Sequence, residues 1–109
     1  MKSLYVLNEK LEPVLVTTEQ FFEYVAKNGE PARQVKLDFV DGVKISTTFL
    51  GVALVLLASP DNPPLLFETF VFGKKHDGLV RRYRTWEDAV AGHAEVVDLV
   101  KNNEPEATD

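Results

Sequence analysis

The chain has 109 residues, enough for one domain with its own hydrophobic core, and 45% hydrophobic with 27% charged residues exclude a disordered chain. The formal net charge of −5 argues against a general nucleic-acid binder, because such binding depends on many cations. The absence of cysteine excludes disulfides, thiolate metal sites and a cysteine nucleophile.

The hydropathy pattern shows neither a signal peptide nor a membrane-spanning segment. The N-terminus, MKSLYVLNEK, lacks the apolar core of a signal peptide. The longest apolar run, Leu50 to Ala58, is too short to span a bilayer. We therefore expect a soluble, cytoplasmic protein.

The first third of the chain predicts a hairpin and a helix. Apolar stretches at Leu4 to Leu7 and Pro13 to Val16 flank a polar connection, as in two short strands. Thr17 and Gln20 have the spacing of a helical capping box, and Asn28-Gly29 is a helix stop signal. The expected helix carries one apolar stripe, formed by Phe21, Phe22 and Val25.

Two strands joined by a tight turn follow. Val35 to Val40 and Val43 to Phe49 both alternate between apolar and polar residues. A two-residue turn at Asp41-Gly42 would place Leu37 and Phe39 beside Lys44 and Ser46, which mixes core with solvent. A three-residue turn with Gly42 in the left-handed conformation places Val35, Leu37 and Phe39 on one face with Val43, Ile45 and Thr47. The pattern therefore favours the bulged, three-residue turn.

The second half predicts two more strands and a long helix. From Leu50 onward the alternation ends, and both odd and even positions are apolar, as in a strand covered on both sides or an apolar surface loop. Gly51 suggests a bulge where the alternation ends. SPDNPP interrupts the chain before strands at Leu65 to Phe72 and Leu79 to Tyr83. Thr85 caps a final helix whose apolar positions recur at helical spacing, from Trp86 to Val100.

The predicted order is ββαββββα, which with short connections means an α+β fold: an antiparallel sheet with two helices packed on it. Residues 1–103 form a single domain in this prediction, and residues 104–109 form a flexible tail.

Three stretches resemble a family of small proteins encoded by bacteriophages and prophages. They are ISTTFLG, PPLLFETFVFG and RYRTWEDAVAGHAEVV, in that order, and the similarity covers roughly Val43 to Val100. The resemblance implies a phage origin and expression in the cytoplasm of a bacterial host, and it carries no assigned chemistry. The chain departs from the family after FLG, where it has Val52-Ala53-Leu54 in place of Leu-Asp-His.

Two buried polar candidates stand out. Glu68 lies in the apolar run LLFETFVF, where a carboxylate of raised pKa could serve in acid–base catalysis. The favoured interpretation is an ion pair with Arg82 or Arg84 across the hairpin, which requires no catalysis. His93 lies on the apolar stripe of the last helix, directly after Gly92. A core histidine is the favoured interpretation, and the alternative is a ligand position. No metal-binding motif is present, so we expect neither a metal nor a cofactor.

One basic cluster precedes the last helix. It consists of Lys74, Lys75, His76, Arg81, Arg82 and Arg84. The cluster is either a binding edge for an anion or partner, or protection of a sheet edge against aggregation.

The sequence contains no phosphate loop, nucleophile elbow or zinc-protease motif, so catalysis is not expected. The leading hypothesis is an accessory protein that binds a host or phage protein. The alternatives are a self-assembling structural component, and a small hydrolase or metal protein that uses Glu68 and His93. Surplus apolar residues also predict a homodimer, built around Leu50, Val52, Leu54 and Leu56.

Overall fold

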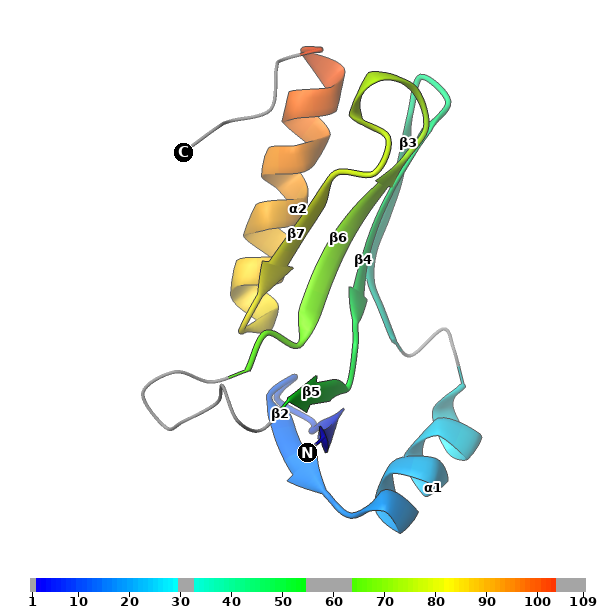
Figure 1. The fold of residues 1–109 in the computed structure, drawn as a ribbon, viewed down its shortest axis with the longest axis vertical. Helices are drawn as coiled ribbons and strands as arrows, with labels where there is room; N and C mark the ends of the chain where they lie inside the picture. The colour runs from blue at the N-terminus through cyan, green and yellow to red at the C-terminus, as the bar shows by residue number, and fades with distance from the viewer. Residues whose placement is uncertain (1, 30–32, 55–63, 104–109) are drawn as a thin grey trace.

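A computed structural model describes residues 2–29, 33–54 and 64–103 (Figure 1). The predicted tail, residues 104–109, lies outside the described residues. The elements are β1 (Lys2–Leu7), β2 (Pro13–Val16), α1 (Thr18–Asn28), β3 (Gln34–Val40), β4 (Val43–Phe49), β5 (Val52–Leu54), β6 (Phe67–Phe72), a 3-10 turn η3 (Lys74–His76), β7 (Val80–Tyr83) and α2 (Trp86–Lys101). The predicted α+β class with antiparallel strands and two helices is confirmed, and the predicted order ββαββββα holds except that the structure has one more strand, β5, between β4 and β6.

The strands form two antiparallel sheets rather than one. The larger sheet has the order β3-β4-β6-β7, and the smaller has the order β2-β1-β5. Gly51, with a φ of 76°, is buried against Phe21 and Phe49 at the corner where the chain leaves the large sheet for the small one. The chain after Phe49 therefore does not simply extend β4, because Val52, Ala53 and Leu54 pair with β1 around this corner.

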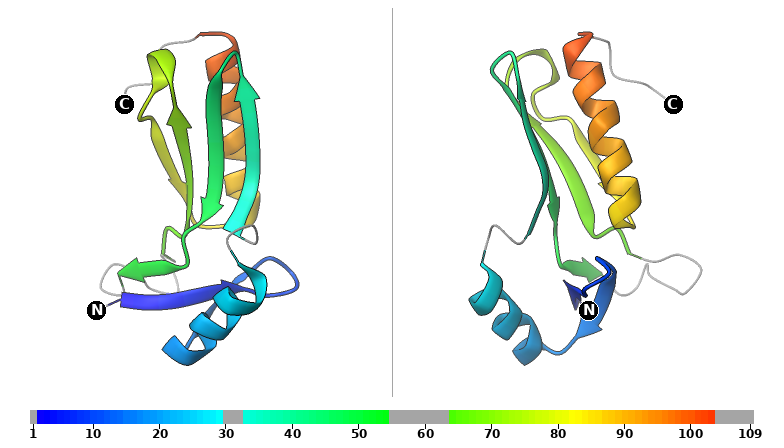
Figure 2. Two further views of the ribbon diagram at one scale, coloured as in Figure 1. Left: turned by 90° about the vertical axis from the view of Figure 1, so that its right-hand side faces the viewer. Right: turned by 180° about the vertical axis from the view of Figure 1, so that it is seen from behind.

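Helix α2 lies along one face of the large sheet, which we call the covered face (Figure 1, Figure 2). Its core contacts form two clusters. One contains Val43, Ile45, Val71, Leu79, Val96 and Leu99, and the other contains Leu7, Phe49, Leu66, Phe67 and Ala89. Trp86 is partly buried at the edge of the second cluster and meets the Phe67 ring edge-on, with centroids 6.4 Å apart.

Helix α1 lies beside the small sheet, at the other end of the molecule from the tip of the β3–β4 hairpin (Figure 1). The predicted capping box is present, since the Thr17 hydroxyl accepts from the Gln20 amide and the Gln20 side chain accepts from the Thr17 amide. The helix ends as predicted, with Gly29 as its C-cap. None of its residues is buried.

The predicted turn between β3 and β4 is wrong. Val40 pairs with Val43 and Phe39 pairs with Lys44, so the connection has two residues, Asp41 and Gly42. Both have positive φ, 50° and 82°, which is the conformation of a type I′ turn and matches the twist of the strands. Leu37 and Phe39 consequently lie on the face opposite α2.

The expectation that Val35 shares a face with Leu37 and Phe39 is also wrong. The pairing of β3 with β4 shifts between Gln34 and Lys36, where one extra residue enters β3. A bulge of this kind reverses the side-chain alternation of a strand. Val35 therefore packs against the second core cluster, on the covered face.

Candidate functional site

The face of the large sheet away from α2, which we call the open face, carries three cross-strand rows of side chains. Strand pairing defines each row. The first row is Phe39, Lys44 and Phe72; the second is Leu37, Ser46, Phe70 and Val80; the third is Gln34, Thr48, Glu68 and Arg82.

The first two rows are mainly apolar and remain in contact with water. Phe39 is 68% exposed, and Leu37, Phe72 and Val80 are 42%, 46% and 43% exposed. Single exposed apolar residues are common on protein surfaces, but a contiguous group of large ones is typical of an interaction surface. The open face therefore has the composition of a binding surface at the end nearest the β3–β4 turn.

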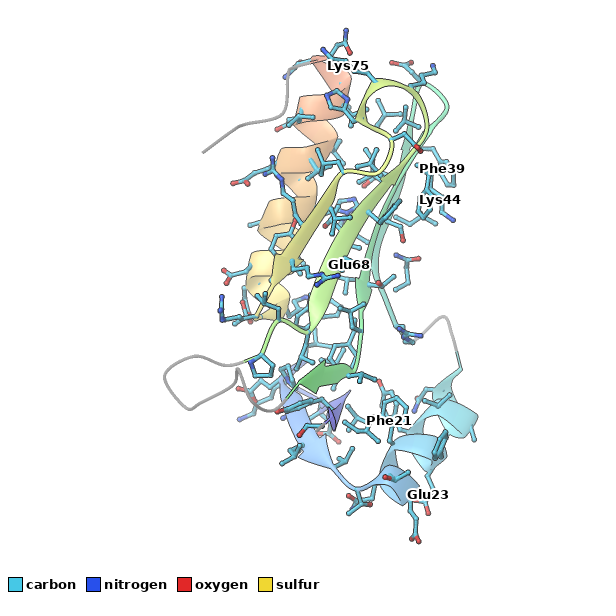
Figure 3. The ribbon with its side chains drawn as sticks, viewed as in Figure 1. Phe21, Glu23, Phe39, Lys44, Glu68 and Lys75 are labelled. Atoms are coloured by element: carbon cyan, nitrogen blue, oxygen red, sulfur yellow. The ribbon has the colours of Figure 1, made fainter. Side chains whose placement is uncertain are left out.

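Two cations also lie on the open face, Lys44 between Phe39 and Phe72 in the first row and Arg82 in the third row. The Lys44 ammonium lies 5.3 Å from the centre of the Phe72 ring, in the range of a cation–π interaction. In the third row, Arg82 Nε donates to Glu68 Oε2 at 3.0 Å. Glu68 is therefore the partner of an arginine across the β6–β7 pair, and it lies on the open face (Figure 3).

The covered face holds a continuous chain of polar side chains beneath α2. The ring nitrogens of His93 contact Thr47 Oγ1 at 2.7 Å and Asp38 Oδ2 at 2.8 Å. Thr47 Oγ1 lies 2.5 Å from Thr69 Oγ1, and the Tyr83 hydroxyl donates to Thr69 at 3.1 Å. Each strand of the large sheet thus contributes one residue to a network that meets α2 at His93.

One direction of donation satisfies the whole network. A carboxylate can only accept, so His93 Nε2 carries a proton and donates to Asp38. Nδ1 can then accept from Thr47, Thr47 from Thr69, and Thr69 from Tyr83. Among the described residues, no buried side-chain nitrogen or oxygen lacks a partner.

Burial raises the pKa of Tyr83 above its ordinary value of 10.0, and the negative charge of Glu95 adds to this. The hydrogen bond with Thr69 and the positive charge of Arg81 act in the opposite direction. The Tyr83 hydroxyl therefore keeps its proton at neutral pH, as its role as a donor requires.

The network has the composition of a catalytic Asp–His–hydroxyl arrangement, but a substrate could not reach its hydroxyl groups. Thr47 and Thr69 are both 0% exposed, and α2 covers them. A nucleophile must reach its substrate, so this geometry joins the helix to the sheet and does not expose a reactive hydroxyl. Glu68 and His93, the residues of the hydrolase hypothesis, lie on opposite faces of the large sheet and do not converge.

The six basic candidates are distributed over several places. Lys74, Lys75 and His76 line a hollow of about 180 Å³ near the end of α2. Lys74 donates to the Asp41 carbonyl and Lys75 to the Asn103 carbonyl, while His76 is buried. Figure 3 shows Lys75 at the end of the molecule far from Glu68.

The remaining three basic residues point elsewhere. Arg81 lies 3.9 Å from Glu95 of α2, and Arg82 is on the open face with Glu68. Arg84 lines a cleft of about 320 Å³ between the β1–β2 hairpin and the start of α2, where Tyr5 and Trp86 supply apolar surface. The basic residues therefore do not form one patch.

The segment predicted to form a dimer is only partly described. Leu50 is half-buried and Val52 is exposed. The Leu54 side chain and Leu56 lie outside the described residues.

Sequence reasoning missed Asp38, Thr47, Thr69 and Tyr83 as partners of His93, and it missed the open face. The two-residue turn was the available signal, since Asp-Gly is a strong signal for a type I′ hairpin. Once that turn is accepted, alternation places Asp38 beneath the last helix and Phe39 on the opposite face.

Within residues 2–29, 33–54 and 64–103, no group of His, Asp and Glu side chains has the arrangement of a metal site. In the same part of the chain, no helix is long and apolar enough to cross a bilayer. Comparisons of the chain with protein-family models, with curated proteins and with solved structures found no match.

Proposed function

We propose that this protein acts by binding another protein through the open face of its large sheet, and that it performs no chemistry of its own. The observation that carries the proposal is the group of exposed side chains at Leu37, Phe39, Phe72 and Val80. One face of the sheet is covered by α2, whereas this apolar face has no covering element among the described residues (Figure 2).

The composition of the open face favours a protein partner over a nucleic acid. Aromatic residues and arginine are enriched at the centres of protein interfaces. A nucleic acid needs several cations to follow its phosphates, but Arg82 is paired with Glu68, and the carboxylate itself repels phosphate. Lys44 in the first row and Arg82 in the third row fit a partner that has acidic groups on two sides of an apolar area.

The resemblance of the chain to phage and prophage proteins supports a host or phage protein as the partner, met in the bacterial cytoplasm. The polar network around His93 supports the same proposal indirectly. It ties the four strands to α2, and a rigid sheet presents its side chains to a partner with little loss of conformational freedom.

The experiment compares two variants that change exposed apolar residues. Phe39→Ser/Phe72→Ser removes both aromatic rings of the first row, while Leu15→Ser changes another exposed apolar residue, on β2, as a control. Proteins captured from host extract on the wild-type chain are identified, purified and titrated against all three chains. We expect about 30-fold weaker binding by the double variant and unchanged binding by the control, as for the loss of an interface hot spot.

Both variants must keep the wild-type circular dichroism spectrum and unfolding midpoint. A purified partner that binds the double variant as tightly as wild type contradicts the proposal. So does a labelled single-stranded oligonucleotide that binds wild type and loses its affinity for the double variant, because the open face would then be a nucleic-acid site.

A further inference from the structure

The open face has features that fit a second copy of the same face. In a two-fold dimer each surface must complement itself, since residue i contacts residue j and j contacts i. The three rows of the open face allow this to be examined strand by strand, because two packed sheets face each other about 10 Å apart with their strands within about 30°.

A two-fold axis that runs parallel to the strands, between β4 and β6, places each row of one copy against the same row of the other copy. Each row meets the same row of the other copy with the strand order reversed, so β3 faces β7 and β4 faces β6. Leu37 then faces Val80, and Ser46 faces Phe70. In the first row Lys44 faces Phe72, which extends to the second copy the cation–π contact already present within one chain.

The polar row is matched by the same operation. Thr48 faces Glu68, and Gln34 faces Arg82, so each charged residue meets a hydrogen-bonding side chain. An axis perpendicular to the strands places the first row of one copy against the third row of the other. The Phe72 ring of one copy would then bury the Glu68 carboxylate of the other. The parallel axis is therefore the better match.

Helix α1 adds a second observation. It projects to the side of the open face in both views of Figure 2, and Phe22 on it is 64% exposed. An axis parallel to the strands keeps the α1 helices of the two copies at the same end of the dimer. In this arrangement α1, with the exposed Phe22, therefore lies at the same end of both copies and on the side of the open face.

We infer that the protein forms a two-fold dimer in which the open faces of two copies pack together, giving four layers with α2 on the outside of each sheet. The inference rests on the proposed function, because it assigns an occupant to the same face. A host or phage protein that binds this face competes with the second copy. The interface differs from the one around Leu50, Val52, Leu54 and Leu56 that the sequence indicated.

Light scattering over a wide range of concentration measures the dimer directly. We expect the mass to rise from 12.2 kDa toward twice that value as concentration increases. Phe39→Ser/Phe72→Ser should weaken the dimer by about 30-fold or more, as for loss of an interface hot spot, while Leu15→Ser leaves it unchanged. A wild-type mass of 12.2 kDa at all concentrations, or a double variant that dimerises like wild type, overturns the inference.

Cysteine cross-linking determines the axis, because the natural chain has no cysteine. Thr48→Cys lies next to the proposed axis and should form a cross-linked dimer with a short bifunctional maleimide, because thiols on sheets about 10 Å apart are beyond the reach of a disulfide. Ala94→Cys on the exposed side of α2 is the control and should give no cross-linked dimer. Cross-linking of Ala94→Cys alone contradicts the face-to-face arrangement. Failure of Thr48→Cys in a protein that is dimeric contradicts the parallel axis.

The inference and the proposed function can fail separately. A wild-type chain that stays monomeric, but whose purified partner no longer binds Phe39→Ser/Phe72→Ser, shows that the face binds another protein and that the second copy is not its occupant. A wild-type dimer that a purified partner leaves intact while binding the Phe39 and Phe72 face contradicts the inference, because one face cannot hold both.

Discussion

Helices α1 and α2 both begin at a threonine cap and both carry apolar residues at helical spacing, but α2 buries five residues and α1 buries none. The five are Ala89, Gly92, His93, Val96 and Leu99. The α2 helix lies on a four-stranded sheet, whereas α1 lies beside a small sheet with little surface to offer (Figure 1). The same local signals therefore specify a helix in both places, and the available sheet decides how much of it is buried.

The largest effect should come from the closest contact between α2 and the sheet. A Cβ atom at Gly92 would lie 2.1 Å from Tyr83 Cε1, so Gly92→Ala forces the ring to move. We expect a loss of about 2–3 kcal/mol in the free energy of unfolding from this overpacking, although alanine is the better helix former. Denaturant unfolding measures the loss.

A double-mutant cycle identifies the cause. In a Tyr83→Ala background the ring is absent, so adding Gly92→Ala should cost little or should stabilise the helix. A full, additive cost in that background would show that Gly92 is needed for some reason other than the Tyr83 ring.

A matched pair of valines compares the two helices directly. Val96 is completely buried in α2, and Val25 is exposed in α1. Val96→Ala should lower the free energy of unfolding by about 2 kcal/mol, the value of a buried valine side chain, and Val25→Ala should change it by less than about 0.5 kcal/mol. Equal losses, measured at a concentration where the chain is monomeric, would mean that α1 is packed as firmly as α2.

Removal of the two threonine caps should affect different parts of the protein. Thr85 accepts from the Asp88 amide and Thr17 from the Gln20 amide. Loss of either cap costs its helix about 1 kcal/mol. We expect Thr85→Ala to lower global stability by about this amount, because α2 unfolds with the core, and Thr17→Ala to speed hydrogen exchange in α1 only. Faster exchange throughout the sheet of Thr17→Ala would show that α1 and the sheet unfold together.

The smallest effect concerns pH and Tyr83. Burial raises the pKa of Tyr83 in the folded protein above its value in the unfolded chain, so the folded state favours the protonated hydroxyl. This contribution is present below about pH 10 and is lost as the pH rises through the folded pKa. Tyr83→Phe, which cannot titrate, should lose about 1 kcal/mol near neutral pH and a smaller amount relative to wild type above pH 10. A constant difference across that range would contradict the direction of the shift.

The elements themselves could be predicted, because capping and alternation are local. Thr17 with Gln20, Gly29 after α1 and Thr85 before α2 all act within a few residues, and each has the predicted role. The turn between β3 and β4 could not be settled by asking which choice keeps apolar residues together. That criterion assumes that every apolar residue belongs to the core, and Phe39 and Leu37 do not.

The sequence by itself determined the α+β class, the order of the elements other than β5 and the caps of both helices, since these depend on interactions between near neighbours. The tertiary structure decided the division into two sheets, because Gly51 turns the chain only where Phe21 and Phe49 pack against it. It also decided the partners of His93, since Asp38 and Thr47 are 55 and 46 residues away. A periodic pattern assigns a residue to one of two faces, and only the packing of α2 decides which face is covered and which stays open.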